Sequence, residues 1–286
     1  MESQDQLSAV LESSIAPFPW VEFALLFGSG ALGRLREDSD LDVAVYVDSN
    51  GRLEIEAARE HPAEVELQVA LERATNRNVD LLILNRAPAT VCASALLTGR
   101  RALMRNPALY TRYFLAVTDV AIDFLQTERE YRAIAARSHS VSELDKSRLL
   151  RVLEFITIEL QDAPQFKEVS LHTYRSQRDM RRNFDRWVET LINAALDAAK
   201  IVLSTEHRPV PQTYAQIPSD IESVPGFSSL EGMLSPLAAL RNIIAHEYLD
   251  LRFPRVKKFA EEDCEHVRSF AAICNDWLSG ERATSA

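Results

Sequence analysis

The sequence predicts an α/β first half followed by an all-α second half, and two observations support this division. Residues 1–105 contain three short apolar runs of strand length, with a helical pattern between the last two. After Asn106-Pro107 such runs end, and apolar residues recur at helical spacing instead. Strands that alternate with helices are typical of helices packed on a sheet, whereas helices alone form a bundle.

The strand candidates of the first half are apolar and partly β-branched. They span residues 21–27 (VEFALLF), 41–47 (LDVAVYV) and 79–84 (VDLLIL). Residues 62–75 begin with a proline, which suits a first helical turn, and mix apolar with charged residues. We therefore predict a helix between the second and third strands.

Five segments of the second half show helical patterns. They span residues 108–137, 143–160, 179–203, 236–248 and 255–278. The pattern in residues 143–160 is apolar nearly all round the middle of the helix, which predicts a buried helix. Residues 204–227 carry four prolines, so we expect mostly loop there.

The composition is that of an ordinary folded protein. Of the 286 residues, 47% are apolar and 26% are charged, which excludes disordered and collagen-like classes. No apolar run approaches the ~18 residues of a membrane span, and residues 1–10 do not resemble a signal peptide. Cys92, Cys264 and Cys274 show neither metal-ligand spacing nor a pairing pattern. We therefore expect a cytoplasmic protein with no membrane segment.

The net charge of −10 limits how this chain could bind nucleic acid. A protein whose whole surface binds nucleic acid is usually basic, so contact with RNA requires a local basic patch. A stripe of arginines at roughly helical spacing is the candidate, and it comprises Arg175, Arg178, Arg181, Arg182 and Arg186. A solvated helix face is the ordinary explanation of such a stripe. Arg178 and Arg182 are the residues we expect to meet RNA phosphates if the domain acts on RNA.

Acidic residues open two of the predicted strands. Asp40 and Asp42 lie on one face of the second strand, because successive side chains of a strand alternate between faces. Asp80 begins the third strand, where an acid interrupts an apolar run. Neighbouring carboxylates raise one another's pKa unless a cation lies between them, and oxygen ligands favour Mg²⁺ or Mn²⁺. If the two strands are adjacent, the three carboxylates could hold two metal ions.

A glycine–serine pair ends the first strand, and ten residues separate it from Asp40. Gly28 allows the backbone to approach a phosphate closely, and Ser29 offers a hydroxyl and an N–H to phosphate oxygens. Arg34 could contact phosphate charge, although a solvated surface position explains it equally well.

Together these residues form a motif of Gly-Ser, ten residues and Asp-x-Asp, which resembles the minimal nucleotidyltransferases of the polymerase β superfamily. The segment VDLLILNRAP resembles their third acidic strand, and the resemblance covers about residues 15–105. It implies a mixed sheet with flanking helices, ATP or another NTP, two metal ions and transfer of a nucleoside monophosphate to a hydroxyl. It also implies that Asp40 and Asp42 are metal ligands, that Asp80 is the third acid, and that Gly28 and Ser29 hold the triphosphate.

A second motif, RNIIAHEYLD, lies in the helix predicted over residues 236–248. On an ideal helix Arg241 and Tyr248 share a face, whereas His246 lies on the order of 140° away from Arg241. Regular geometry therefore does not bring Arg241 and His246 together, unless the helix ends near His246 or a second copy supplies its own set.

This motif resembles the HEPN family, in particular the HEPN toxins with R-x4-H-x-Y that are encoded beside minimal nucleotidyltransferase antitoxins. The resemblance covers about residues 143–280. It implies an all-α fold that dimerises and a metal-independent RNA-cleaving site. In that site Arg241 stabilises phosphorane charge, His246 is the general acid or base, and Asn242 orients the phosphate. It also implies that Tyr248 is the tyrosine that receives AMP, which silences the nuclease.

The two resemblances predict three regions and one leading function. The regions are a nucleotidyltransferase domain at residues 1–106, a connecting helix and linker at 107–142, and a HEPN-like domain at 143–286. The leading hypothesis is an adenylyltransferase that transfers AMP from ATP to Tyr248 or a partner's tyrosine and so controls a ribonuclease. A small-molecule nucleotidyltransferase of the aminoglycoside type, with a helical acceptor-binding domain, is the alternative. A third hypothesis is a non-enzymatic binding module whose catalytic site has decayed, but the intact acidic triad argues against it.

Overall fold

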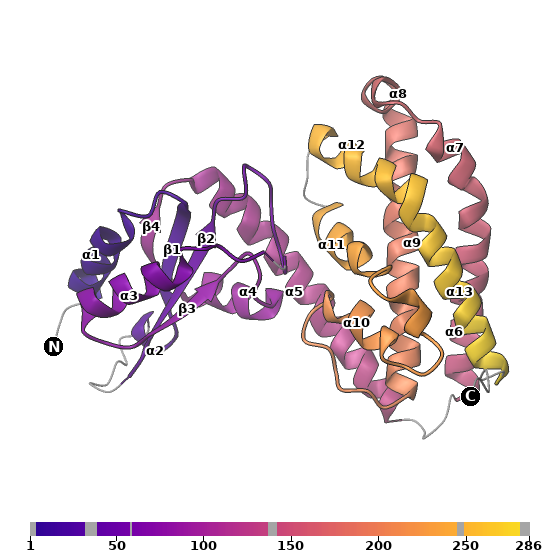
Figure 1. The fold of residues 1–286 in the computed structure, drawn as a ribbon, viewed down its shortest axis with the longest axis horizontal. Helices are drawn as coiled ribbons and strands as arrows, with labels where there is room; N and C mark the ends of the chain where they lie inside the picture. The colour runs from indigo at the N-terminus through magenta and orange to yellow at the C-terminus, as the bar shows by residue number, and fades with distance from the viewer. Residues whose placement is uncertain (1–3, 32–38, 58, 137–141, 245–248, 281–286) are drawn as a thin grey trace. The chain divides into compact units, whose positions relative to one another are not determined.

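The computed structural model describes residues 4–31, 39–57, 59–136, 142–244 and 249–280. The chain divides into two compact units, residues 1–123 and 124–286. Helix α5 (Pro107–Ala135) runs across this division (Figure 1).

A four-stranded mixed sheet forms the centre of the N-terminal unit, with the strand order β3-β2-β1-β4. The strands are β1 (Val21–Phe27), β2 (Leu41–Val47), β3 (Val79–Ile83) and β4 (Arg100–Met104). Strand β1 is antiparallel to β2 and β4, whereas β2 and β3 are parallel. The helix α3 (Glu64–Thr75) connects β2 to β3, as a parallel pair requires a crossover. The expectation of a mixed sheet is therefore confirmed.

Helices cover both faces of this sheet. The first face packs on α1 (Gln4–Ile15) and α3, with Leu11, Leu67 and Leu71 buried against the valines of β2. The second face packs on α4 (Ala89–Thr98) and on the first part of α5. Phe23 and Tyr46 stack on that face with ring centroids 5.1 Å apart. This layering fixes the backbone of the strands on which the predicted acids lie.

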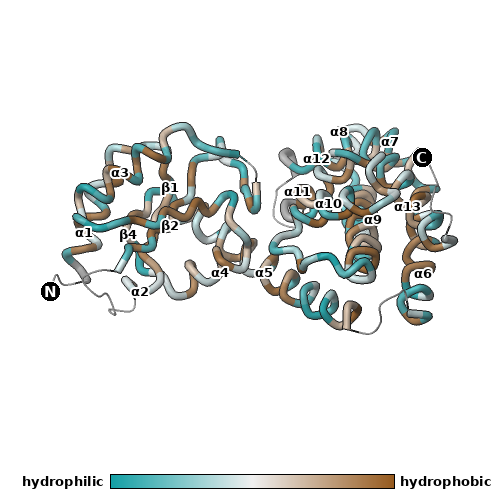
Figure 2. Tube along the Cα trace, turned by 60° about the horizontal axis from the view of Figure 1, so that its bottom comes forward, coloured by the Kyte–Doolittle hydropathy of each residue, from teal (hydrophilic) through white to brown (hydrophobic). Residues whose placement is uncertain are grey.

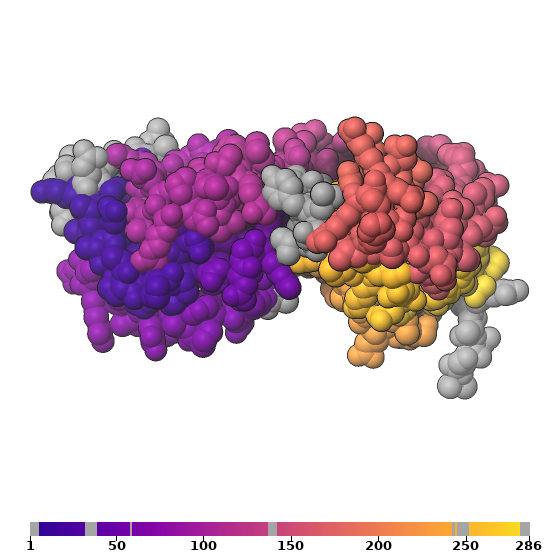
Figure 3. Space-filling view, turned by 90° about the horizontal axis from the view of Figure 1, so that it is seen from above, coloured from indigo at the N-terminus to yellow at the C-terminus, as the bar shows by residue number. Residues whose placement is uncertain are grey.

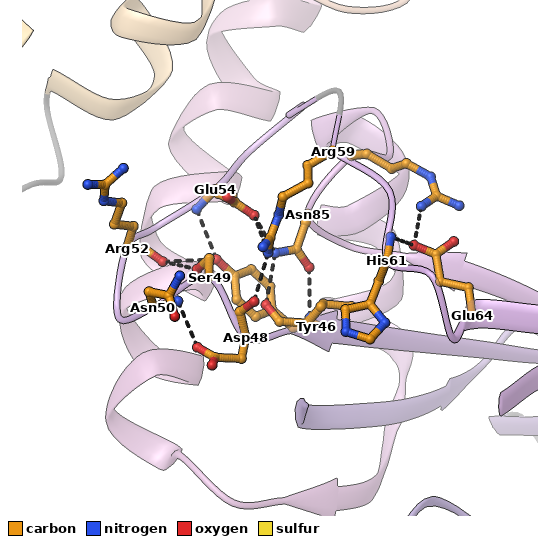
Figure 4. Close-up of polar contacts among 12 residues, drawn as sticks. Tyr46, Asp48, Ser49, Asn50, Arg52, Glu54, Arg59, His61, Glu64 and Asn85 are labelled. Carbon is orange, nitrogen blue, oxygen red and sulfur yellow. Dashed lines mark hydrogen bonds and ion pairs between the residues drawn. The ribbon is translucent and has the colours of Figure 1, made fainter. Parts of the chain in front are cut away.

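A polar cluster lies at the Val47 end of β2, where Asn85, Glu54, Arg59 and Asp48 meet (Figure 4). Asn85 is 2% exposed, and its amide donates to the carbonyl of Val47 and to a carboxylate oxygen of Glu54, both at 3.0 Å. The N–H of Val47 donates to the Asn85 side chain at 2.8 Å. Arg59 donates to the carbonyl of Asp48 and to Glu54. The partners satisfy one another, so we interpret the cluster as structural.

The described residues of the C-terminal unit form helices joined by turns and loops, and the longest loop lies within the proline-rich segment expected to be mostly loop, at residues 206–215. Its elements are α6 (Glu143–Glu159), η1 (Leu160–Asp162), α7 (Ala163–Lys167), α8 (Leu171–Ser176), α9 (Arg178–Thr205), α10 (Gln216–Glu222), η2 (Ser228–Leu230), α11 (Ser235–Ile244), α12 (Leu249–Lys258), the π-helical turn η3 (Phe259–Asp263) and α13 (Cys264–Ser279). Helix α9 is central, and α6, α10, α11 and α13 pack on it. The α13 segment also lies beside α6 (Figure 3). The predicted helical bundle is confirmed.

Two helix predictions for this unit were wrong. The helix expected over 255–278 begins at Leu249, continues through Pro254 and is interrupted by η3 before α13. Helix α6 is not buried all round, because it packs on α9 and α13 with one face only. Leu149, Leu153 and Ile156 lie on the packed face, while hydrophobic and hydrophilic residues alternate along the helix (Figure 2).

No helix in the described parts of the chain has the length and apolar character needed to cross a membrane.

Candidate functional site

The acids predicted in the N-terminal unit meet at one edge of the sheet. Asp42 and Asp80 are register partners in the parallel pair β2/β3, so their side chains lie on the same face. The end of β1 reaches the same edge, because Phe27 pairs with Asp42 in the antiparallel ladder. Gly28 follows Phe27 directly and begins the short helix α2 (Gly28–Ala31). The fold thus brings the glycine–serine turn and the acids of β2 and β3 together.

The electrostatics of Asp42 reflect its burial and its acidic neighbours. Burial raises the pKa of Asp42 above its ordinary value, and the charges of Asp80 and then Asp40 raise it further. A backbone hydrogen bond from Ser29 acts in the opposite direction and lowers the pKa. Asp42 is half-buried, whereas Asp40 and Asp80 are exposed. The charged form of Asp42 is therefore disfavoured by burial and by both acidic neighbours.

Gly28 lies against the Asp42 side chain. Its φ of +63° belongs to the left-handed region, and a Cβ on it would stand 2.8 Å from Cγ of Asp42. No other residue type fits there without displacing the carboxylate. The sequence signal for this contact was the glycine at the end of the first strand, although only the fold shows which side chain it meets.

Asp40 is held by a residue that the sequence analysis did not single out. The Asn78 amide donates to Oδ1 of Asp40 at 3.2 Å. Both residues line an open hollow of about 490 Å³ that Arg73 and Arg77 also border. Of the three acids, Asp40 borders this hollow, whereas Asp42 and Asp80 do not line it. A polar residue two positions before Asp80 was the available signal for Asn78.

The donor set suits a divalent cation. Three carboxylates with mutual repulsion offer the oxygen ligands that Mg²⁺ and Mn²⁺ prefer, and a cation between them would relieve that repulsion. In the parts of the chain that the structure describes, no three acidic, histidine or cysteine side chains already surround one point at metal-binding distance. The carboxylates are thus close neighbours and not a finished coordination sphere.

Arg241 is the described member of the second motif. It lies in the last turn of α11, half-buried, with its guanidinium 4.0 Å from the centre of the Tyr214 ring. Its Nη2 donates to the Tyr214 hydroxyl at 3.4 Å, and that hydroxyl lies 3.0 Å from the hydroxyl of Thr127. No sequence pattern connected Tyr214 with Arg241, because the two residues come from separate segments that only the bundle brings together.

Several predicted residues lie outside the described parts of the chain or are described only in part. Arg34, His246 and Tyr248 belong to segments that the structure does not describe. The backbone of Asn242 lies in α11 beside Arg241. Whether Arg241, His246 and Tyr248 converge therefore stays a prediction.

The arginines predicted to meet RNA lie on the surface of the C-terminal unit. Arg178 and Arg182 are exposed, and they occupy the first turns of α9 at a spacing of one helical turn. Arg186 continues the same face one turn later, with its side chain 71% exposed. Three arginines of the predicted stripe thus form one solvated ridge at the start of α9. Arg175 lies in α8 instead, and Arg181 is half-buried and donates to the Tyr174 carbonyl at 3.4 Å.

Both halves of the chain match models of known families. Residues 11–108 match the family described as Polymerase beta, Nucleotidyltransferase, and residues 121–273 match the family described as Ribonuclease HepT-like. The chain has no match among curated proteins.

Two solved structures are similar to parts of the chain. One, described as a crystal structure of the toxin-antitoxin with AMP-PNP, is 20% identical with a TM-score of 0.37, over 46% of this chain and 98% of its own. The other, described as the toxin-antitoxin MntA-HpeT mutant, is 18% identical with a TM-score of 0.35, over 48% of this chain and 100% of its own.

Proposed function

Because the chain belongs to the Ribonuclease HepT-like family and carries a polymerase β nucleotidyltransferase domain ahead of that region, we propose that it controls a HEPN ribonuclease by adenylylation. The proposed reaction is Mg²⁺-dependent transfer of AMP from ATP to a tyrosine. The acceptor is Tyr248 of the same chain or of a partner copy. The presence of both domains in one chain favours self-modification. A homodimer formed through the helical domain would allow one copy to modify the tyrosine of the other.

The pairing of Asp42 with Asp80 in the parallel β2/β3 ladder, with Gly28 against the Asp42 carboxylate, is the observation that supports this proposal most. Because the carboxylates repel one another, a cation bound between them would be electrostatically stabilised. Divalent ions bound there would neutralise the charge of the triphosphate and of the transition state. Asp40 and Asp42 are the proposed ligands, and Asp80 is the third acid.

In the proposed transfer, the tyrosine Oη attacks the α-phosphorus of ATP. The new Oη–P bond forms while the bond from the α-phosphorus to the pyrophosphate oxygen breaks, and pyrophosphate leaves. Asp80 orients the hydroxyl and accepts its proton, which then passes to solvent. Gly28 keeps bulk away from the phosphates, and Ser29 and Arg34 bind their oxygens. ATP is thus a substrate, and Mg²⁺ or Mn²⁺ is the required ion.

The product would silence the nuclease through charge and volume. In the proposed nuclease, Arg241 stabilises the phosphorane, His246 is the general acid or base, and Asn242 orients the scissile phosphate. AMP on Tyr248 places an anionic phosphate and a base two residues from His246. The phosphate of the RNA is then excluded by like charge and by bulk.

The intact mass of the purified full chain tests the transfer. Incubation with ATP and Mg²⁺ should add one or more AMP units, and peptide mapping should place them on Tyr248. Tyr248→Phe and Asp42→Ala should remain unlabelled. Asp48→Asn is the matched control, because this exposed carboxylate lies just beyond the other end of β2, and it should be labelled like the wild type. Transfer to an aminoglycoside without self-labelling would instead identify a small-molecule nucleotidyltransferase.

Growth of an expression host tests the coupling to the nuclease. Asp40→Ala with Asp42→Ala should make expression toxic, and addition of Arg241→Ala or His246→Ala should relieve the toxicity. Normal growth with the double aspartate variant would contradict restraint of the nuclease within one chain.

A further inference from the structure

A groove between α6 and α9 has no role in the chemistry described above. The two helices run antiparallel, and the Trp187 indole N–H donates to the Glu159 carbonyl at 2.7 Å. Two open hollows of about 380 Å³ and 340 Å³ lie along this pair of helices. Both are lined by Phe155 of α6 and by Arg186 and Thr190 of α9, so they form one continuous groove with Phe155 at its middle.

Phe155 is an aromatic side chain held at the surface. It is 37% exposed, whereas Ile156 beside it is fully buried in the core of the unit. Phe155 thus offers part of a ring to whatever enters the groove. Amide and hydroxyl groups of Asn193 and Thr190 border the same space.

Three arginines border the first hollow in a protein whose net charge is −10. Arg151 and Arg148 come from α6, and Arg186 comes from α9. Arg148 is paired with Glu130 at 3.0 Å, so Arg151 and Arg186 are the arginines we assign to ligand binding. The contact of Arg186 with Glu189 at 3.2 Å is an exposed pair of small energy, which a phosphate can displace.

The first hollow also contains an acidic residue, Asp197, whose charge is neutralised by a buried lysine. Asp197 lines the groove, but its carboxylate pairs at 2.8 Å with Lys200, whose side chain is only 4% exposed. The positive charge of Arg151 and Arg186 is therefore not cancelled by Asp197 in the first hollow. Glu159 and Asp162 border the second hollow, so the phosphate contacts are assigned to the first. The ridge of Arg178 and Arg182 leads into the groove, because these residues precede Arg186 on one face of α9 at intervals of four.

We propose that this α6–α9 groove is a binding subsite for single-stranded RNA. Phe155 stacks on one unpaired base, and Arg151 and Arg186 hold the phosphates on either side of it. Thr190 and Asn193 hydrogen-bond to the edge of the base or to the ribose hydroxyl. An exposed aromatic ring between guanidinium groups is the chemistry that binds unpaired bases with little sequence preference. The inference rests on the proposed ribonuclease function for the identity of the polymer, and it adds where that polymer binds.

Fluorescence of 2-aminopurine in a short single-stranded RNA tests the stacking. The full chain carrying His246→Ala serves as the parent, so that binding is measured without cleavage. Binding should quench the probe, and Phe155→Ala should abolish the quenching and weaken affinity by about tenfold. Phe155→Trp should restore both. Ile158→Ala is the matched control, because Ile158 is an exposed apolar residue one turn away on the same helix and does not line the groove.

Salt dependence tests the two phosphate contacts. Arg151→Gln with Arg186→Gln should lower the slope of log affinity against log salt by about 1.4, since each phosphate contact on a single strand contributes about 0.7. A fully paired RNA duplex of the same length should compete poorly, because it offers no unpaired base.

The groove and the ribonuclease proposal can fail separately. If Phe155→Ala binds the probe like the parent, the subsite is refuted, even where wild-type protein cleaves RNA. If Phe155→Ala and Ile158→Ala both alter the oligomeric state while RNA affinity is unchanged, the face is an interface between copies and the subsite is again refuted. If binding depends on Phe155 while the wild type cleaves no RNA, the subsite stands and the nuclease role fails.

Discussion

The backbone of Gly28 lies so close to the carboxylate of Asp42 that a methyl group at position 28 would have no room. The left-handed φ of +63° and the proximity of Cγ of Asp42 both require glycine there. The turn after β1 and the acid at the start of β2 are therefore one structural unit, in which the backbone that approaches the nucleotide also positions the central carboxylate.

Gly28→Ala should reduce AMP transfer by about 100-fold, because displacing a catalytic carboxylate by an ångström is costly. Gly51→Ala is the matched control, since Gly51 also has a left-handed φ, of +74°, but nothing lies within 4 Å of a Cβ there. Both variants should lose about 1 kcal/mol of stability to backbone strain, and only the first should lose activity. Steady-state transfer rates at saturating ATP measure the difference. Equal activities would show that the Asp42 contact does not matter.

Asp42→Asn should melt at a higher temperature than the wild type in the presence of EDTA, by about 2 °C. The substitution removes the charge that Asp80 and Asp40 repel, while a side-chain oxygen can still accept the Ser29 hydrogen bond. Mg²⁺ should raise the melting temperature of the wild type and leave that of the variant unchanged. Differential scanning fluorimetry with and without Mg²⁺ measures both effects. A Mg²⁺ response that survives in the variant would remove Asp42 from the metal site.

The stability of the C-terminal unit should fall at acidic pH through Glu130. Burial alone would raise the pKa of Glu130, but hydrogen bonds from Lys200 and Arg148 outweigh it and lower the pKa from 4.5 to about 2. A depressed pKa means that the stabilisation is present above pH 4.5 and disappears as the pH falls toward 2. At pH 6 the free energy of unfolding of the wild type should exceed that of Glu130→Gln by roughly 2 kcal/mol. This difference in stability should shrink between pH 4.5 and pH 2. Urea unfolding at a series of pH values measures it, and a pH-independent gap would contradict the assignment.

Asn85→Leu should destabilise the N-terminal unit by roughly 2–4 kcal/mol, because Val47 and Glu54 lose buried hydrogen-bond partners. The Asn85 cluster binds Val47 at the last residue of β2, whereas Asp42 is the second residue of that strand. AMP transfer per folded molecule should therefore stay within about twofold of the wild type. Chemical denaturation and active-site titration separate the two quantities. A large loss of activity in the folded fraction would show that the cluster also positions the catalytic edge.

Replacement of Arg178, Arg182 and Arg186 by glutamine should weaken RNA binding and lower its salt slope by about 2, since each phosphate contact contributes about 0.7. Arg132→Gln is the control, because its side chain is 68% exposed and lies outside the stripe. Filter binding between low and physiological salt measures the slope. An unchanged slope in the triple variant would exclude the stripe from RNA recognition.

Local sequence patterns predicted many of the elements. The strands β1 and β2 begin and end at the predicted residues, since continuous β-branched and apolar runs bounded by polar residues are a strong local signal. Strand β4 was not predicted, because its five residues, RRALM, carry two arginines and owe their conformation to pairing with β1. Helix α6 was predicted to be a buried helix. This prediction was wrong because an apolar pattern does not show how many faces of a helix have a neighbour.

The sequence by itself determined which candidate catalytic groups are present: a glycine–serine turn, a pair of acids on one strand face and a third acid on another strand. Those features depend on spacing within a few residues, because the alternation of side chains along a strand decides on which face each one lies. Only the tertiary structure decided that Asp80 is the register partner of Asp42, that Gly28 packs on Asp42 and that Tyr214 lies under Arg241. Such contacts join segments that are distant in the chain, and their geometry is set by the packing of the whole unit and not by local preference.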